Sequence, residues 1–331
     1  QRRIARRQAR PVADGGLRGT GRQLRTGPRA PFFVGARWRG TNHRYDMNWQ
    51  SSRFLIDLTQ PRVMGIVNVT PDSFSDGGTH DTPSQALAHC EQLLGEGCDI
   101  LDIGGESTRP GSPAVSLEDE LARVMPVVRE AVKLGVPVSV DTYKPQVMRE
   151  VLDAGADIIN DIWALRLPGA QEAVGAHPTC GVCLMHMHRD PQTMQADPMR
   201  GQVLGAVHDF LAERASALRA AGVAATRIVL DPGIGFGKTV EQNFELLERQ
   251  AELMAIGYPL LAGWSRKGSL GAVTGIQNAA GRMVPSVAAA LLAVERGARV
   301  VRVHDVKETV AALAVWRAAH SMTTQQQEAS R

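Results

Sequence analysis

The chain has 331 residues, of which 44% are hydrophobic and 21% are charged, an ordinary composition for a globular protein. It contains no run of about 18 apolar residues and no apolar signal-peptide core, which argues against a membrane span and against export. We therefore expect a cytoplasmic protein whose length allows one large domain and an extension.

The charge is divided between two unlike parts of the chain. Residues 1–46 contain twelve Arg, no Lys and two Asp, a net charge of +10, whereas the remainder carries −7. The first part is rich in Gly and Arg without apolar periodicity, so we expect it to be disordered. We favour an upstream or non-native extension, with Met47 as the natural first residue. An organelle-targeting peptide and a nucleic-acid-binding arm stay open, but few aromatic residues interleave the arginines, and we expect no nucleic-acid partner.

Eight short apolar runs follow between residues 63 and 304, and each finishes on a polar or chargeable group. Runs of this length indicate strands buried on both faces, and segments with helical periodicity, such as 116–135 and 241–257, separate most of them. The runs cover residues 63–69, 98–108, 137–142, 157–162, 181–187, 227–233, 259–267 and 299–305. Eight βα repeats predict an α/β fold, a (β/α)8 TIM barrel over 47–320, with a flexible tail at 321–331.

In such a barrel, chemistry is built where the strands end. A barrel that needed only stability would have little reason to place polar groups at nearly every strand end. The pattern therefore indicates an enzyme. The groups at the predicted strand ends are Asn68, Thr108, Asp141, Asn160, Asp231, Lys267, Arg302 and His304.

Cys180 and Cys183, followed by His186 and His188, superficially have the spacing of metal ligands. The stretch is predicted to be a buried strand, however, and positions i and i+3 of a strand face opposite sides. The two thiols then cannot share one metal, so we predict that they pack in the core. We expect no disulfides.

A glycine-rich stretch, DPGIGFGKT at 231–239, follows the sixth run. A phosphate-binding P-loop would need Gly where Pro232 stands, and a dinucleotide fingerprint would need Gly in place of Lys238. We expect a tight loop whose glycines let the backbone approach a ligand, with Phe236 offering an apolar face and Asp231 pointing into the barrel mouth. A simple tight turn is the alternative.

Asp141 and Asp231 lie at the ends of the predicted third and sixth strands, and Asn160 lies near the end of the fourth run. Carboxylates in a barrel mouth can act as general acid or base, bind a metal, or accept hydrogen bonds from a ligand. Together with an amide, they suit a flat heterocycle with an amino-amidine edge, such as a pterin. The alternative for Asp141 is a helix cap, because Lys144 and the proline after it suggest a helix start.

Three further features suggest anion binding. The stretches 68–78 and 104–112 are long for βα connections and rich in hydroxyl groups, which favours functional loops. Arg302 and His304 alternate with Val303 on the last run, so both face the same side and suit a phosphate. A structural salt link to the preceding helix is the alternative for this pair.

Eight longer strings extend over these strand ends and loops: MGIVNVTPDSFSDGG, DIGGESTRPGS, SVDTYKP, IINDIWAL, LMHM, LDPGIGFGKT, GWSRKGSL and RVHDVKETV. In this order they closely resemble the dihydropteroate synthases of bacterial folate synthesis. The resemblance runs from about Arg53 to about Ala319 and covers essentially the whole barrel. It implies a transferase that joins 6-hydroxymethyl-7,8-dihydropterin diphosphate to 4-aminobenzoate, releases diphosphate and is the target of sulfonamides.

The resemblance also implies roles for individual residues. The pterin would be held by Asp141, Asn160, Asp231 and Lys267. The diphosphate, with Mg²⁺ as cofactor and Asn68 as its ligand, would be held by Asn68, Arg109, Arg302 and His304. The 4-aminobenzoate would contact Thr108, Pro110, Phe236 and Ser265, under a first loop that closes through Pro71. The residues expected to carry catalysis are Asp141, Lys267, Arg302 and His304.

The resemblance implies a homodimer, and it leaves some points open. Tyr143 stands where the family more often has Ser, Trp163 where Arg or Ser is commoner, and Gly268 where Ser is usual. A different pterin-binding barrel of the methyltetrahydrofolate methyltransferase type, or a non-catalytic paralogue, remains the alternative function.

Overall fold

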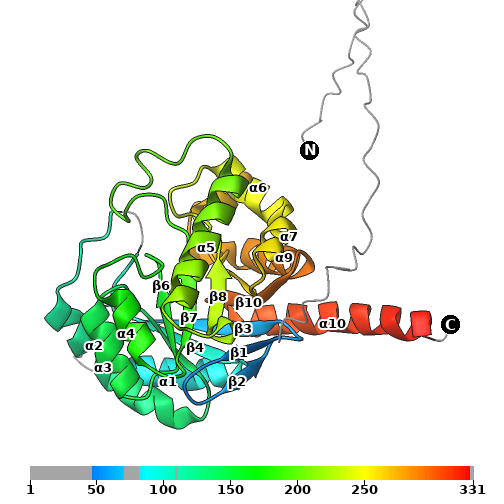
Figure 1. Cartoon of the computed structure of the whole chain (residues 1–331). Coiled ribbons are helices and arrows are strands. Elements are labelled where there is room, and N and C mark those ends of the chain that lie inside the picture. The colour runs from blue at the N-terminus through cyan, green and yellow to red at the C-terminus, as the bar shows by residue number, and fades with distance from the viewer. Residues whose placement is uncertain (1–46, 71–81, 109–110, 329–331) are drawn as a thin grey trace, which may run out of the picture. The chain divides into compact units, whose positions relative to one another are not determined.

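The computed structural model describes residues 47–70, 82–108 and 111–328. Within them, eight parallel strands close a barrel in the order β10-β3-β4-β5-β6-β7-β8-β9, and Figure 1 shows the helices around these strands. The predicted (β/α)8 TIM barrel is confirmed. The barrel strands are β3 (Arg62–Asn68), β4 (Ile100–Gly104), β5 (Val138–Asp141), β6 (Ile158–Asp161), β7 (Gly181–Met185), β8 (Ile228–Asp231), β9 (Leu260–Ala262) and β10 (Ala298–Val303).

Each predicted run overlaps one of these strands, but β4 and β9 are shorter than expected by six residues each. β4 stops at Gly104 and β9 at Ala262. Thr108 and Lys267 therefore lie in the connections that follow these strands, and the expectation that both stand at strand ends is wrong. In the second case the chain turns at Arg266, which adopts a left-handed conformation with φ 57°.

Ten α-helices are assigned in the described residues. They are α1 (Thr82–Gly95), α2 (Leu117–Ala131), α3 (Pro145–Asp153), α4 (Ala170–Ala176), α5 (Val203–Ala220), α6 (Val240–Glu248), α7 (Gln250–Leu253), α8 (Gly268–Thr274), α9 (Met283–Glu295) and α10 (Val306–Glu328). The last of these runs through most of the segment that the sequence analysis sets apart as a tail.

The sequence predicts helices most clearly over residues 116–135 and 241–257, and only the first prediction is confirmed as a single helix. The first is confirmed as α2, which Ser116 caps by accepting the Asp119 N–H at 3.0 Å. The second, expected as one helix over 241–257, is broken into α6, α7 and a 3-10 turn. At the start of α7, Gln250 is buried and donates to the Ala293 carbonyl at 2.9 Å.

The amino-terminal end of the barrel is closed by a hairpin that the sequence analysis did not predict. β1 (Asn48–Gln50) pairs with β2 (Leu55–Asp57) in antiparallel register. Trp49 is fully buried, packs against the innermost layer of barrel side chains, and donates its indole N–H to the Arg227 carbonyl at 3.0 Å. That layer consists of Met64, Ile100, Ile158, Cys183, Val229, Leu261 and Val300.

A second and larger apolar core fills the space between strands and helices, and the two cysteines of the seventh run separate between these cores. Cys180 belongs to the outer core and Cys183 to the inner layer. The prediction that they face opposite sides of one strand is confirmed, and both are buried free thiols.

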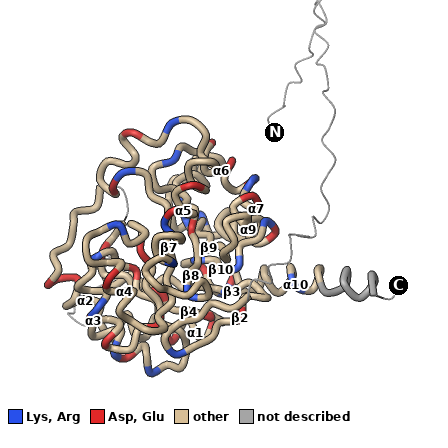
Figure 2. Tube along the Cα trace, in the orientation of Figure 1, with Lys and Arg blue, Asp and Glu red and all other residues tan. Residues whose placement is uncertain are grey.

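The described residues outside the cores carry mixed charge. Figure 2 shows acidic and basic residues interspersed over the helices and connections around the barrel. None of the described helices combines the length and the apolar character needed to cross a membrane.

Candidate active site

A layer of polar side chains lies directly above the inner apolar layer, toward the carboxyl ends of the strands. Strand side chains alternate between faces, so a residue two positions after an inward-facing one also points inward. Asp102, Asn160, Asp231 and Arg302 each stand two positions after a member of the inner layer. The fold therefore brings four side chains from four strands together in one buried polar site.

Arg302 on β10 links this layer to β4 and to β5. Its Nε donates to Asp102 Oδ2 at 2.6 Å and its Nη2 donates to Asp141 Oδ2 at 2.7 Å. The Asn160 amide also donates to Asp102 Oδ2, at 3.2 Å. Three predicted residues and one unpredicted residue thus form a single network, which we call the mouth cluster: Asp102, Asp141, Asn160 and Arg302.

The structure excludes two alternative roles that the sequence left open, one for Asp141 and one for Arg302. Asp141 does not cap the helix that follows it, because α3 has Lys144 at its N-cap position and no side-chain cap. Arg302 pairs with carboxylates from β4 and β5, so a salt link to the preceding helix is also wrong. Both side chains are turned into the barrel.

The sequence analysis missed Asp102, although its side chain is fully buried. The signal was an acidic residue in the middle of an apolar run. A carboxylate is costly to bury there unless it is paired. Asp102 Oδ1 has no hydrogen-bond partner within the described part of the chain, so the mouth cluster holds an unused acceptor.

Burial and neighbouring charges shift the pKa values of the side chains at the barrel mouth. Desolvation raises the pKa of Asp141 to about 7, since the opposing attraction of Arg302 is partly offset by the neighbouring Asp102. Burial also raises the pKa of Asp231, against the lowering effects of the Gly233 N–H and the Lys267 ammonium. Burial alone would lower the pKa of Arg302, but Asp102 and Asp141 raise it above its ordinary value. Arg302 therefore stays charged.

The glycine-rich loop after β8 packs differently from what we expected. Gly233 and Gly237 have φ 68° and 69°, and an added Cβ would lie 1.8 Å from the His186 carbonyl oxygen or 2.8 Å from that of His188. These two glycines therefore let the loop approach the chain after β7, not a ligand. Only at Gly235 would a Cβ meet a predicted site residue, because Lys267 Cδ would be 3.2 Å away.

Lys238 holds this loop from within, and the sequence analysis did not assign it a role. Its ammonium is buried and donates to the carbonyls of Gly233, Phe236 and His186 at 2.7, 3.2 and 3.3 Å. Burial lowers the pKa of Lys238 to about 7, while Asp231 opposes that shift. The loop conformation therefore depends on a buried amino group that donates to three backbone carbonyls.

Two pairs of predicted residues line the other side of the mouth. Lys267 Nζ lies 4.1 Å from the centroid of the Phe236 ring, at cation–π distance. Ser265 Oγ accepts the His304 backbone N–H at 3.0 Å and lies 2.9 Å from His304 Nδ1. The serine hydroxyl therefore contacts both the backbone and the ring of His304 and fixes the orientation of the imidazole.

The remaining predicted residues lie at the same end of the barrel or outside the described residues. Asn68 ends β3 and pairs in register with Gly104, next to β5 and Asp141. Thr108 lies four residues beyond the end of β4. Arg109, Pro110 and Pro71 fall outside the described residues.

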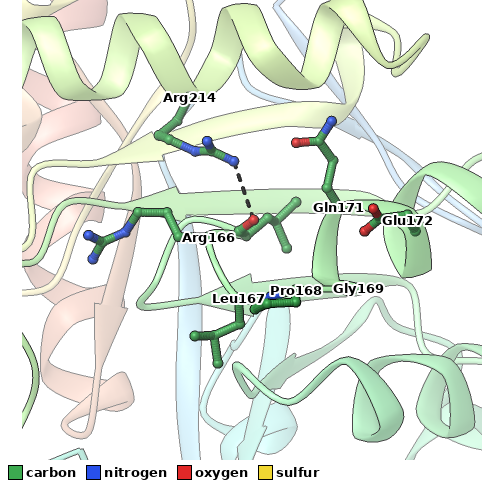
Figure 3. A pocket seen from close by; sticks show the side chains of 8 residues that line it. Arg166, Leu167, Pro168, Gly169, Gln171, Glu172 and Arg214 are labelled. Atoms are coloured by element: carbon green, nitrogen blue, oxygen red, sulfur yellow. Dashed lines mark hydrogen bonds between the residues drawn. The ribbon is translucent and has the colours of Figure 1, made fainter.

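A separate surface hollow of about 270 Å³ contains none of the predicted site residues. It lies between the connection after β6 and helix α5, and Figure 3 shows Arg214 reaching the loop backbone there. Arg214 donates to the carbonyls of Ala164 and Leu165 at 2.9 and 3.3 Å. Since these bonds hold the loop itself, we assign the chemistry to the mouth cluster and not to this hollow.

Comparison with known proteins agrees with this placement. The family model described as pterin binding enzyme matches residues 64–304. The chain is 54% identical over 273 residues to the dihydropteroate synthase of Neisseria meningitidis serogroup C, covering 82% of this chain and 96% of that protein. It is 48% identical over 261 residues to the dihydropteroate synthase of Escherichia coli strain K12, covering 78% and 92%.

Solved structures show the same similarity. The Xanthomonas albilineans dihydropteroate synthase with 4-aminobenzoic acid matches with a TM-score of 0.76 at 52% identity, covering 80% of this chain and 95% of that one. The Burkholderia cenocepacia dihydropteroate synthase complexed with 7,8-dihydropteroate matches with the same TM-score and identity, covering 84% and 98%. The family expected from the sequence motifs is confirmed: this chain belongs to the pterin-binding enzymes and, among them, to the dihydropteroate synthases.

Proposed function

We propose that this chain condenses 6-hydroxymethyl-7,8-dihydropterin diphosphate with 4-aminobenzoate to give 7,8-dihydropteroate and diphosphate, and that sulfonamides compete for the 4-aminobenzoate site. The observation that carries the proposal is the mouth cluster, a buried set of hydrogen-bond acceptors at the carboxyl ends of the strands. Relatives of this chain include enzymes solved with the product and with 4-aminobenzoic acid.

The pterin ring fits the buried polar layer. Its amino-amidine edge is rich in N–H donors, which pair with acceptor-only carboxylates such as Asp231 and Asp141. Asp102 Oδ1, buried and without a partner within the described residues, adds an acceptor. Asn160 supplies both a donor and an acceptor, and Lys267 donates to the ring carbonyl or a ring nitrogen. A buried acceptor without a partner is costly, so pairing it with the ring favours binding.

The diphosphate would lie nearer the rim, where positive and amide groups gather. Arg302 has five N–H groups, so its two carboxylate contacts leave donors for an anion. The imidazole of His304, held by Ser265, supplies a further N–H donor. Arg109 and Asn68 complete the set that we propose for diphosphate.

A magnesium ion would be held mainly by the diphosphate and by water, with the Asn68 amide oxygen as its protein ligand. The described residues contain no group of three or more His, Cys, Asp or Glu suited to a metal. Such a donor set fits Mg²⁺, which commonly keeps its waters and binds substrate phosphates with few protein ligands. When bound, the ion would neutralise charge on the leaving group.

In the reaction, the bond between the exocyclic methylene carbon and the diphosphate oxygen breaks, and the diphosphate takes the electron pair. The ionised carboxylate of Asp141 stabilises the positive charge that develops on the methylene carbon and the ring. The amino group of 4-aminobenzoate, positioned by Phe236, Ser265, Thr108 and Pro110, forms the new carbon–nitrogen bond and releases a proton. The chain supplies orientation and charge, and no covalent intermediate with the enzyme is required.

The test is a coupled assay of diphosphate release. The expected result is release that needs both 4-aminobenzoate and Mg²⁺, with dihydropteroate formed in equal amount. A methyl group transferred from methyltetrahydrofolate, or no turnover of either substrate pair, would overturn the proposal. Omitting each component in turn is the control.

We further propose that the enzyme works in the cytoplasm as a homodimer. The four buried free thiols suit a reducing compartment. Apolar side chains are exposed on two neighbouring outer helices, Val273 on α8 and both Val284 and Leu292 on α9. Sedimentation at micromolar concentration should show twice the chain mass, and a single-chain mass would contradict the dimer.

A further inference from the structure

Two aromatic residues meet at the rim of the barrel. Tyr143 follows β5 and Trp163 follows β6, and their ring centroids lie 6.5 Å apart with an interplanar angle of 61°. Both pack on a small apolar cluster at the mouth that includes Phe236. A cation covers the outer face of each ring: Lys144 Nζ lies 4.7 Å from the Tyr143 centroid, and the Arg166 guanidinium carbon lies 4.9 Å from that of Trp163.

The Tyr143 hydroxyl connects this rim to the loop after β4. It donates to Glu106 Oε1 at 2.8 Å. Lys144 binds the other oxygen of Glu106 and also contacts Glu120 Oε2, a buried carboxylate on α2. Tyr143 and Lys144, which both follow β5, therefore bind the two oxygens of the Glu106 carboxylate in the connection after β4. A serine at 143 is too short to make the Tyr143 contact from the same backbone.

Glu106 in turn holds its own loop together. Its Oε1 accepts the Val115 backbone N–H at 3.3 Å. The hydroxyls of Ser112 and Ser107 meet at 3.0 Å, so the described halves of the loop are linked twice. Thr108, which we assign to 4-aminobenzoate, directly follows Ser107. Burial and the Glu106 carboxylate raise the pKa of Tyr143 to about 12, so its hydroxyl keeps its proton and remains a donor.

We propose that Tyr143 is a positioning residue of this enzyme: by holding Glu106, it fixes the loop that carries Thr108 and so sets the affinity for 4-aminobenzoate. The inference rests on the proposed function for its substrate. It assigns no contact between Tyr143 and the pterin, which the buried mouth cluster binds. The two substrates should therefore respond differently when the hydroxyl is lost.

The first experiment removes only the hydroxyl. Tyr143→Phe keeps the ring and its contact with Trp163, so we expect KM for 4-aminobenzoate to rise about threefold to tenfold, the range of one ordinary hydrogen bond, because Tyr143 acts on the substrate only through the loop. KM for the pterin diphosphate and kcat should stay within about twofold. The matched control is Tyr258→Phe, which removes a tyrosine hydroxyl just before β9, at the opposite end of the barrel.

A double-mutant cycle then tests the route through Glu106. In a Glu106→Ala background, Tyr143→Phe should no longer change KM for 4-aminobenzoate, because the shared contact is already absent. Full additivity of the two changes would overturn the proposal. An equal rise in KM for both substrates, or no rise in either, would also overturn it.

Hydrogen exchange separates this inference from the proposed function. In ligand-free protein, Tyr143→Phe should speed exchange of the Val115 amide by about threefold to tenfold, because its acceptor Glu106 is held less firmly. Amides of β7 and β8 should exchange as before. If the unmodified chain makes no dihydropteroate, the proposed function fails while this comparison still decides whether Tyr143 positions the loop. Unchanged exchange at Val115 would show that it does not.

Discussion

At the scale of single residues, the mouth is a site with more acceptors than donors. The carboxylates of Asp102 and Asp231 are buried in the mouth and that of Asp141 is partly buried there, and within the described part of the chain only Arg302 forms ion pairs with two of these three. Unpaired carboxylates in such surroundings are costly. A ring that offers several N–H groups relieves this cost by donating to the carboxylates. A ring without such donors would leave the carboxylates unpaired, so the site should bind it more weakly.

Asp231 allows a selective test of this idea. Its Oδ1 accepts the Gly233 N–H at 2.7 Å, and an asparagine can keep that contact with its amide oxygen. Asp231→Asn should therefore leave the loop in place but present a donor where the pterin needs an acceptor. We expect pterin binding to weaken by about 2–4 kcal/mol, measured by calorimetry. Affinity close to that of the unmodified enzyme would remove Asp231 from the pterin site.

Asp141 should make pterin affinity depend on pH. Its pKa is raised to about 7, so its carboxyl takes up a proton as pH falls below that value. Only the ionised form is purely an acceptor, so affinity should be full above about pH 7 and fall by at most about tenfold per unit below it. Titration calorimetry between about pH 5.5 and 8.5 measures this dependence. In Asp141→Asn, which cannot ionise, the dependence should disappear, and a persisting slope would assign it to another group.

At the scale of elements, what the sequence predicted and what it missed have separate physical causes. The barrel strands were predictable because burial on both faces requires continuous apolar runs. The hairpin β1–β2 was not, because two strands of three residues leave too short a pattern. Asp102 was hidden within a run that otherwise looks like core. Lys238 could not be assigned because its acceptors are backbone carbonyls, which only the folded loop brings together.

The site residues were located mainly by family resemblance, and their partners came only from the fold. The sequence predicted that Arg302 lies on the last strand and faces the same side as His304. It could not show that Asp102 and Asp141 draw the guanidinium into the barrel, because those contacts span 200 and 161 positions along the chain. Gly268 gains no explanation from the structure, since an added Cβ there would meet open space.

A substitution in the β1–β2 hairpin tests the stability of the barrel without changing any residue of the mouth cluster. Trp49→Ala removes a fully buried indole from the inner layer and its hydrogen bond to Arg227. We expect the free energy of unfolding in urea to fall by about 3–5 kcal/mol. The matched control is Leu55→Ala on β2, because Leu55 is 65% exposed and its loss should cost about 0.5 kcal/mol or less. A similar cost for both variants would mean that Trp49 contributes little to closing the barrel.

At the scale of the whole molecule, catalysis should require only the barrel. About four-fifths of this chain covers 96% of the Neisseria meningitidis relative and 98% of the Burkholderia cenocepacia one. The family model begins at residue 64. The basic segment 1–46 lies outside the described residues, and its composition offers little apolar surface to offset the entropy of ordering.

A chain that begins at Met47 should therefore keep the melting temperature and the turnover rate of the full chain. It should also lose any salt-sensitive retention on nucleic acid that the +10 charge of residues 1–46 causes. Thermal unfolding and the diphosphate assay measure the first expectation, and chromatography on immobilised nucleic acid measures the second. A melting temperature lower by several degrees, or a rate reduced about tenfold, would show that the segment stabilises the barrel.

The hairpin also has a kinetic consequence. Trp49, Ile56 and Leu58 pack against the inner layer and cover the amino-terminal end of the barrel, so a ligand should reach the mouth cluster from the carboxyl-terminal end. The mouth cluster that we assign to the pterin lies on the strands, whereas Thr108 stands beyond the strand ends. A molecule of 4-aminobenzoate that binds first would lie between the pterin site and the solvent, and it would block entry of the pterin. Productive turnover should therefore be sequential, with the pterin first to arrive and its ring the last part of the product to leave.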